Sequence, residues 1–417
     1  MRAAPAAATA VSRLARRLYA YAFLEDLILL YPVYALLFSE HGLSAAEISS
    51  LFIIWSSVTF VVEIPSGLWA DLFSRRRLLI LAPLVTGTGY GLWTWLPSYP
   101  AFAAGFVLWG VGSSLRSGTL QALVYEELGR REATDAYARL MGRSQAMGTT
   151  AMMAATAAAG PVLHLGGYGA VGAASVAVCV LGALVARTFP DSRAPRGTSH
   201  PAGTSDEPEG AEGPEADDEP RAGGFAATLR TGLRELRGSP SARDAVLLTS
   251  AVTGALMIDE YVPLLIGSMD VAQSTVPLLM LLVTAGVAAG GWCAGRGARL
   301  LGPALALAAV ALAAGAVSGP AGVVLLAVAF GVFQWAMVTC DALLQDRVTD
   351  RARATVSSLS GFGAEVIGVL LCAGYGLGSR IWEHSTLFVL AAVPYLLIAL
   401  VLRIRAFRHR RRTRRTR

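Results

Sequence analysis

The sequence predicts an all-α integral membrane protein, and three observations support this prediction. Of the 417 residues, 54% are hydrophobic and only 15% are charged, whereas about 25% of residues are charged in a typical soluble domain. The mean hydropathy is +0.53. Apolar runs long enough to cross a bilayer, about 20 residues each, recur along the whole chain, and arginines gather in alternate connections between them. A multi-pass helical protein follows from the three together.

Charge clusters and Gly or Pro breaks divide the chain into about twelve such runs. They cover residues 18–39, 48–70, 78–96, 101–124, 143–163, 168–187, 245–266, 274–295, 302–318, 321–343, 355–377 and 386–404. The ninth run is the weakest, because it is rich in Ala and Gly. The first run is expected to remain as a crossing, since it carries Glu25 and Asp26 and lacks the small-residue cleavage site of a signal peptide.

The positions of the arginines predict the orientation. The basic connections are residues 75–77, 130–143, 187–243, 296–299 and 347–353, and both termini are basic too. The alternate connections hold almost no arginine. Because positive loops stay in the cytoplasm, we expect a multi-pass protein of the cell (inner) membrane with both termini cytoplasmic and an even number of crossings.

A polar stretch near the middle divides the chain into two halves. It is rich in Pro, Gly, Ser and acidic residues and lacks apolar periodicity, which is typical of a disordered linker. The predicted units are a six-helix bundle over 1–190, a disordered or amphipathic cytoplasmic linker over 191–242, a second six-helix bundle over 243–405 and a basic tail over 406–417. Two short stretches of the first half, GLWADLFSRRRLL and QALVYEE, return in the second as GWCAGRGARLL and DALLQDR, which suggests a duplicated bundle.

Several functions are disfavoured by composition. The sequence contains no lysine, so it has no phosphate-binding loop of the kind that drives ATP-powered pumps. The four cysteines have no repeating spacing, and neither a disulfide framework nor a metal site is expected. No nucleophile and base constellation lies within the crossings. We therefore expect neither an enzyme nor a cofactor.

Four charged residues of the first half lie inside the predicted bilayer, and they are the strongest functional signal in the sequence. Counting about 1.5 Å per residue from the cytoplasmic edge, Glu25, Asp26, Glu63 and Arg116 all reach about 12 to 15 Å. Each charge alone would cost roughly 2.5 to 3.5 kcal/mol, so the four are expected to face a cavity or one another. The alternative is a buried ion pair that only holds helices together.

The surplus of acids over arginine predicts a proton site. Arg116 can neutralise one or two of the three carboxylates, which leaves at least one free to carry a proton. Glu63 is the first candidate and Asp26 the second. Glu25 and Asp26 point about 100° apart on a helix, so only one of them is expected to face the cavity.

The second half offers further acids. Glu365 stands among apolar and small residues near the middle of its run, and it is a candidate for binding a cationic substrate or a second proton, although a hydrogen bond from a neighbouring helix would equally satisfy it. Asp259 and Glu260 lie in the outer part of the seventh run, where the favoured interpretation places them at the external mouth.

The loop after the second run carries a recognisable pattern. Its matching residues are Gly67, Ala70, Asp71, Arg75, Arg76 and Leu79, while Leu72 replaces a usual base and Ser74 a usual glycine. With the crossing number, the midpoint linker and the repeated loop, this chain resembles the major facilitator superfamily (MFS) of transporters, which implies twelve transmembrane helices in two six-helix bundles that rock about a central cavity.

The resemblance also implies a cytoplasmic gate in this loop. Asp71 would lie against the positive end of the helix that starts near Thr355, and Arg75 would pair with Glu126, for which Glu127 is a rival. Such contacts would latch the halves together and favour the outward-open state until substrate or a proton releases it. Arg76 and its neighbour are expected only to hold the loop in the cytoplasm.

A second, partial resemblance indicates direction. Gly160 and Pro161, followed by a glycine pair, are similar to a motif of superfamily antiporters near the outer end of the fifth helix. This favours efflux, although a Gly-Pro pair is also found where a membrane helix merely kinks.

The sequence thus predicts a proton-coupled exporter of small amphipathic compounds, acting as a monomer on a small-molecule substrate and protons. Proton-linked or facilitated uptake of a nutrient is the alternative within transport, and a non-transporting membrane scaffold the alternative outside it. The arginine-rich tail, beside a final membrane helix, is expected to bind anionic lipid and no nucleic acid.

Overall fold

The computed structural model is helical throughout the part that it describes, with no strand there. Its backbone is described for residues 3–72, 74–190, 238–294, 297–348 and 353–415, and its side chains for residues 9–62, 74–190, 238–294, 297–348 and 356–404. The predicted linker therefore lies almost wholly outside the described residues. So do the side chains of Glu63 and Asp71, although their backbone and that of Gly67 lie on a described helix.

The first half begins with helices that break or bend within the bilayer. They are α1 (Ala3–Asp26), α2 (Tyr34–Glu40), α3 (Ala45–Leu72), α4 (Arg75–Trp95), α5 (Tyr99–Arg116), α6 (Thr119–Gly129) and α7 (Tyr137–Ala186). α1 and α2 share one crossing, separated by a turn over residues 27–33. α5 and α6 share another, separated at Gly118, whose φ of 72° suits glycine. Both breaks come directly after charged residues.

Two expected crossings are joined in α7, which reverses direction at Gly167. That residue has a φ of 62° and ψ of −167°, a conformation open in practice only to glycine. Before it, Gly148 lies against Asp26 of α1; after it, Gly172 lies against Thr94 and Gly182 against Pro83, so the second part runs antiparallel to α4. The expected fifth and sixth runs are therefore two helices with almost no loop between them.

The second half repeats the plan. Its helices are α9 (Pro240–Ala255), η2 (Leu256–Tyr261), α10 (Val262–Gly267), α11 (Val276–Trp292), α12 (Leu301–Val317), α13 (Val323–Gln345), α14 (Arg353–Gly378) and α15 (His384–Arg415), with single turns η3, η4 and η5 (Gln273–Thr275, Ala298–Leu300 and Gly319–Gly322). α9, η2 and α10 share one crossing. The weak ninth run does form a helix, α12.

The predicted fold class is confirmed: an all-α membrane protein of two six-helix groups. Eight of the described helical segments are long and apolar enough to span a bilayer by themselves, and one of these is α7 with its two crossings. α9 begins at Pro240, where Ser239 caps it by accepting from the Ala242 N–H at 3.3 Å, and α15 continues without a break to Arg415.

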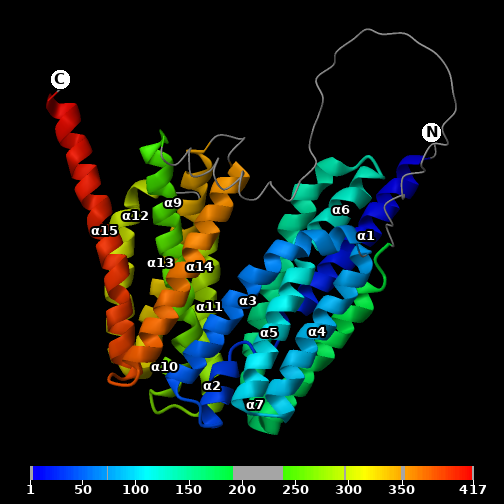
Figure 1. Ribbon diagram of the computed structural model, residues 1–417, viewed down its shortest axis with the longest axis horizontal. Coiled ribbons are helices and arrows are strands. Elements are labelled where there is room, and N and C mark those ends of the chain that lie inside the picture. The colour runs from blue at the N-terminus through cyan, green and yellow to red at the C-terminus, as the bar shows by residue number, and fades with distance from the viewer. Residues whose placement is uncertain (1–2, 73, 191–237, 295–296, 349–352, 416–417) are drawn as a thin grey trace, which may run out of the picture.

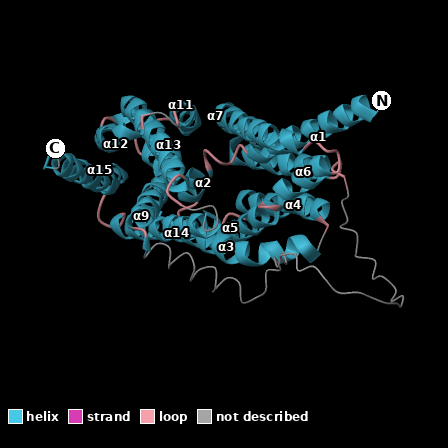
Figure 2. Cartoon of the chain, turned by 90° about the horizontal axis from the view of Figure 1, so that it is seen from above, coloured by secondary structure: helices cyan, strands magenta, loops and turns pink. Residues whose placement is uncertain are grey.

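The two halves stand side by side and meet along two seams. Figure 2 shows α3 beside α14 on one side and α7 beside α11 on the other, and these pairs are in contact. Both chain ends lie at the same end of the molecule in Figure 1, as do the start of α4, which contains Arg75–Arg77, and the connection from α6 to α7, which contains Arg130 and Arg131. We call this end the arginine-rich face and the other end, which contains His41 and Asp270, the opposite face.

Packing within each half depends on close backbone approach. α11 and α13 touch at glycine: a Cβ on Gly286 would lie 2.8 Å from the Ala327 carbonyl carbon, and one on Gly331 would lie 2.7 Å from the Gly286 carbonyl oxygen. Small residues serve this purpose in membranes, where no hydrophobic effect drives helices together. Large apolar side chains such as Leu307, which is 65% exposed, face outward instead, as expected of a surface surrounded by lipid.

Candidate functional site

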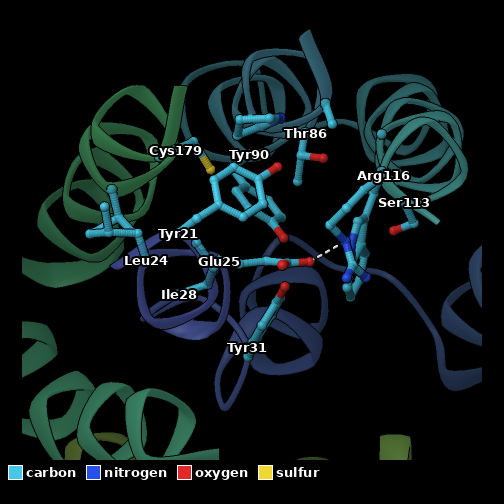
Figure 3. Close-up of a pocket in the computed structure, with 16 residues that line it drawn as sticks. Tyr21, Leu24, Glu25, Ile28, Tyr31, Thr86, Tyr90, Ser113, Arg116 and Cys179 are labelled. Atoms are coloured by element: carbon cyan, nitrogen blue, oxygen red, sulfur yellow. Dashed lines mark ion pairs between the residues drawn. The ribbon is translucent and has the colours of Figure 1, made fainter. Parts of the chain in front are cut away.

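The candidate site begins with an ion pair inside the first half. Glu25 lies one residue before the end of α1, and Arg116 is the last residue of α5. The Arg116 Nε contacts Glu25 Oε1, and Figure 3 shows the two side chains pointing toward each other. Both helices break next to these residues. A cation at the C-terminal end of α5 is favourable to that helix, whereas the acid at the end of α1 needs the arginine to compensate it.

The pair lies in a small pocket among α1, α4, α5 and α7. The pocket holds about 50 Å³ and is walled by apolar groups together with Tyr21, Tyr31, Thr86 and Ser113. Glu25 is only 24% exposed.

Asp26, the neighbouring acid, lies elsewhere. Its Oδ2 rests against Gly148 of α7, at a place where the Cβ of any other residue would overlap it. Asp26 does not line the ion-pair pocket. The separation of Glu25 and Asp26 onto different faces of α1 follows from the helical turn per residue, and the structure pairs Arg116 with Glu25.

A larger cavity lies between the halves. One lobe holds about 340 Å³ and is lined by Trp55, Ser56 and Thr59 from the first half and by Asp259, Glu260 and Glu365, among others, from the second. A second lobe of about 300 Å³ shares Trp55, Asp259 and Glu260. None of the described residues that line either lobe is basic. The result is an acidic, aromatic chamber of the size that holds a small organic molecule.

The interpretation of Asp259 and Glu260 as residues of the external mouth was wrong. They line both lobes of the cavity, on the 3-10 segment η2 and about 11 Å from the end of their crossing at Gly267. The opposite face is closed beyond them, because α10 packs against α2 and a Cβ on Gly267 would lie 2.8 Å from the Leu36 side chain. The sequence shows no signal for this contact between segments about 230 residues apart.

Two walls of the cavity are shared with the ion-pair pocket. Tyr31 and Trp109 line both spaces. Their rings stack at 5.4 Å, and Trp109 stacks in turn on Trp55 at 4.9 Å. We call the stacked rings of Tyr31, Trp109 and Trp55 the aromatic layer; its Tyr31 and Trp109 border both the ion-pair pocket and the cavity. No sequence pattern marks Trp109 as a residue of this layer.

Hydrogen bonds join the halves at three described places. Tyr34 donates to Glu260, and Ser56 donates to Glu365. Tyr261 donates to Ser49 at 2.8 Å. Glu365 is thus a cavity residue and also a hydrogen-bond acceptor from α3, and its binding of a cation or a proton stays a prediction.

The described contacts near the opposite face close the cavity there. A Cβ on Gly376 of α14 would lie 2.9 Å from the Ser49 Cβ of α3, and one on Gly160 of α7 would lie 2.7 Å from the Ser274 carbonyl oxygen of η3. Gly160, which begins the antiporter-like motif with Pro161, is therefore a contact point between the halves.

Gly160→Ala is expected to weaken this closure. A methyl group against the Ser274 carbonyl would cost about 1 to 3 kcal/mol as overpacking, so the population closed at the opposite face should fall roughly tenfold. The measurement is labelling of Leu36→Cys, in a background without other cysteines, by an impermeant thiol reagent added from the opposite face; it should become faster. Gly169→Ala is the matched control, since its Cβ would meet nothing within 4 Å. Equal labelling in the two variants would contradict the assignment.

Comparison with known proteins identifies the family. Residues 8–370 match the family model of the Major Facilitator Superfamily. The chain belongs to this superfamily. Its membership agrees with the membrane-crossing helices, the paired bundles and the central cavity.

Solved structures with the same fold are distant in sequence. The crystal structure of the nucleoside transporter NupG has a TM-score of 0.68 and 12% identity, covering 95% of this chain and 98% of that one. A D-xylose-proton symporter gives 0.65 and 16%, with 94% and 96% covered. A bacterial homolog of the human lysosomal transporter Spinster, in an inward-facing and unoccupied conformation, gives 0.64 and 16%, with 96% and 95% covered. No curated protein sequence matches the chain.

The superfamily's loop motif is partly described. Arg75, the first residue of α4, forms an ion pair with Glu126 of α6. Asp71, another residue of the motif, has its side chain outside the described residues, as does Glu63, and Gly67 of the motif is described only by its backbone. The rival acid Glu127 is used differently: it is 2% exposed, contacts Arg130 at 2.6 Å, and pairs also with Arg131.

The two neighbouring glutamates of this superfamily member should therefore differ in their effect on stability. Glu127→Gln removes the partner of two arginines from a buried position, and we expect it to lower the free energy of unfolding by about 1 to 3 kcal/mol. Glu126→Gln affects an exposed pair and should cost less than about 1 kcal/mol. Thermal unfolding of the purified variants in detergent measures both. A larger loss in Glu126→Gln would show that the Arg75 pair is the one that holds α6.

Proposed function

We propose that this superfamily member is a proton-coupled exporter of small amphipathic compounds that carry positive charge, working by alternating access of the cavity between its halves. The observation that carries the proposal is the chamber itself. It presents Asp259, Glu260 and Glu365 beside Trp55, and no described lining residue offers an opposing positive charge. Carboxylates and the faces of aromatic rings are the groups that attract an organic cation.

Proton coupling is assigned to the acids of the first half. Glu63 is the proposed carrier, with Asp26 as the second candidate. Arg116 would pair with Glu25 and set the charge balance near them. The aromatic layer of Tyr31 and Trp109 touches both spaces, which supports an influence of the ion pair on the cavity.

Alternating access requires contacts that exchange at the two faces. The bonds of Tyr34 with Glu260 and of Ser56 with Glu365 hold the halves together on one side of the cavity. We propose that the loop motif of Gly67, Asp71, Arg75 and Glu126 forms the opposing latch at the arginine-rich face. In this scheme a cation that binds the acids competes with Tyr34 and Ser56 and so releases the closure.

The orientation proposed here places the arginine-rich face in the cytoplasm of a cell (inner) membrane, by the positive-inside rule. A monomer is sufficient, because one chain encloses the cavity. The basic residues 406–417 would lie on anionic lipid, and the continuation of α15 to Arg415 supports a helical anchor.

Reconstitution in liposomes tests the function. Vesicles with an imposed pH gradient would receive a lipophilic organic cation, a nucleoside or a pentose, with an internal dye reporting pH. We expect only the cation to move, opposite to the proton flux. Asp270→Asn, at the opposite face, is the control that should transport normally.

The other outcomes separate the alternatives. Entry of the nucleoside or pentose together with protons would replace export by uptake. Movement of the cation without proton flux would remove the coupling. Protein that moves no solute, and whose cellular role survives neutralisation of Glu25, Asp26, Glu63 and Arg116 together, would be a scaffold.

A further inference from the structure

A second, smaller pocket lies outside the transport path, at the arginine-rich face of the first half. It holds about 140 Å³ and is lined by Ala10, Arg13, Leu14, Arg17, Arg131 and Pro190. Three separate parts of the chain meet there: α1, the connection after α6, and the segment after α7. Half of its lining residues are arginines, and none of them is acidic.

Within the part of the chain that the structure describes, two of the three arginines have no anionic partner. Arg13 and Arg17 form no ion pair or hydrogen bond with any described residue, and they stand four residues apart on α1. Like charges at this spacing repel each other along a helix surface. An anion bound between the two guanidinium groups would attract both of them and so offset their mutual repulsion.

The third arginine is held in place by the buried acid below it. Arg131 pairs with the Glu127 carboxylate and donates to the Glu127 carbonyl oxygen at 2.5 Å. Glu127 is also paired with Arg130 at 2.6 Å, so its charge is already neutralised and cannot serve Arg13 or Arg17. The pocket therefore keeps a net positive charge and one pre-positioned guanidinium.

The floor of the pocket is well packed. Leu14 is 2% exposed and belongs to a buried cluster that also contains Leu128 and Phe189. Because the floor is well packed, the side chains above it need little reorganisation to bind a ligand. The pocket is thus a built feature of the fold rather than a loose surface patch.

Its position indicates which anions can reach it. Arg13 and Arg17 come just before the apolar part of α1, and Pro190 follows the end of the last crossing of this half. This is the level at which headgroups lie. Planar guanidinium groups bind phosphate oxygens in pairs and are the usual partners of phosphate.

We propose that Arg13, Arg17 and Arg131 form a binding site for a phosphate-bearing anion at the arginine-rich face, taken from a lipid headgroup or from free phosphate. The site is separate from the transport cavity, and it is also separate from the basic tail at 406–417. A phosphate bound there would fasten the middle of α1 to the segments that follow α6 and α7.

Binding to the purified full-length protein in detergent tests this site. Phosphatidylglycerol, phosphatidylcholine and inorganic phosphate would be titrated separately, with bound lipid counted by native mass spectrometry and phosphate binding followed by calorimetry. The variants are Arg13→Gln, Arg17→Gln and the double variant. Arg16→Gln is the matched control, because Arg16 lies on the same helix, is exposed, and does not line the pocket.

We expect the double variant to bind phosphatidylglycerol at least about tenfold more weakly, with Arg16→Gln unchanged and with affinity that falls as salt is added. The same pattern with inorganic phosphate alone would support the site and assign it to a soluble anion. Equal losses in Arg16→Gln and Arg17→Gln would overturn the proposal in favour of general surface charge. So would unchanged binding in the double variant. If a glutamine variant cannot be purified, Arg17→Ala with Arg16→Ala gives the same comparison.

Discussion

Arg116→Gln should lower the melting temperature of the purified protein by several degrees, and Glu25→Gln in the same chain should restore most of that loss. The single change leaves Glu25 without its partner in a pocket of about 50 Å³. Removing one partner of a buried pair typically costs about 3 to 5 kcal/mol; since Arg116 is 36% exposed, we expect about 2 to 3 kcal/mol here. Thermal unfolding in detergent measures it.

The double variant, Arg116→Gln with Glu25→Gln, tests whether the two residues stabilise the protein as a pair. If Arg116 matters only by compensating Glu25, then removal of both charges should be tolerated far better than removal of the arginine alone. Proton flux in liposomes then distinguishes structure from coupling: a stable double variant that still exchanges protons would assign the pair to structure. Losses that simply add in the double variant would contradict the pairing.

Asp259→Asn should reduce transport of an organic cation by about 10- to 100-fold at low concentration. Asp259 lines both lobes of the cavity, and no described side chain of the other half hydrogen-bonds to it, so the change removes charge without breaking a bridge. One favourable charge interaction at about 4 Å is worth up to about 4 kcal/mol under partly screened conditions, which is more than a hundredfold preference requires. Initial rates over a range of cation concentrations give the value.

Glu260 and Glu365 need a different experiment, because each also accepts a hydrogen bond that joins the two halves. Glu260→Gln should therefore be compared with Tyr34→Phe, and Glu365→Gln with Ser56→Ala, since the second variant of each pair breaks the bond but keeps the charge. If the acids bind the cation, the charge-removing variants lose apparent affinity for it, while the hydroxyl-removing variants mainly alter the transport rate.

For Asp259→Asn, cation transport within about twofold of wild type would contradict the proposal that the substrate is a cation.

The fold was largely predictable because the solvent constrains it. Spanning helices must satisfy their own backbone in lipid, so hydropathy and arginine position predicted the crossings, including α12 with its Ala-rich sequence. The breaks were not predicted. The turn after Asp26 and the reversal at Gly167 depend on how α1, α4 and α7 pack, and a glycine in a sequence does not reveal whether its φ is positive.

The site was predictable in its charges and less so in its geometry. Depth counting brought Glu25 and Arg116 to one level, and the structure pairs them. Depth alone could not place Asp259 and Glu260 in the cavity, because that depends on the closure of α2 over α10. The aromatic layer of Tyr31, Trp109 and Trp55 likewise depends on contacts between crossings that are distant in sequence, and a single sequence does not show which crossings touch.

The stacked rings of Tyr31, Trp109 and Trp55 also make the protein its own optical probe. Trp109 borders both the ion-pair pocket and the cavity, and its indole stacks on that of Trp55 at 4.9 Å. Because the sequence has eight tryptophans, the contribution of Trp109 to the intrinsic fluorescence is the difference between the intact protein and a Trp109→Phe variant. That difference should change when the chamber is occupied and when Glu25 is replaced by glutamine, with no dye attached.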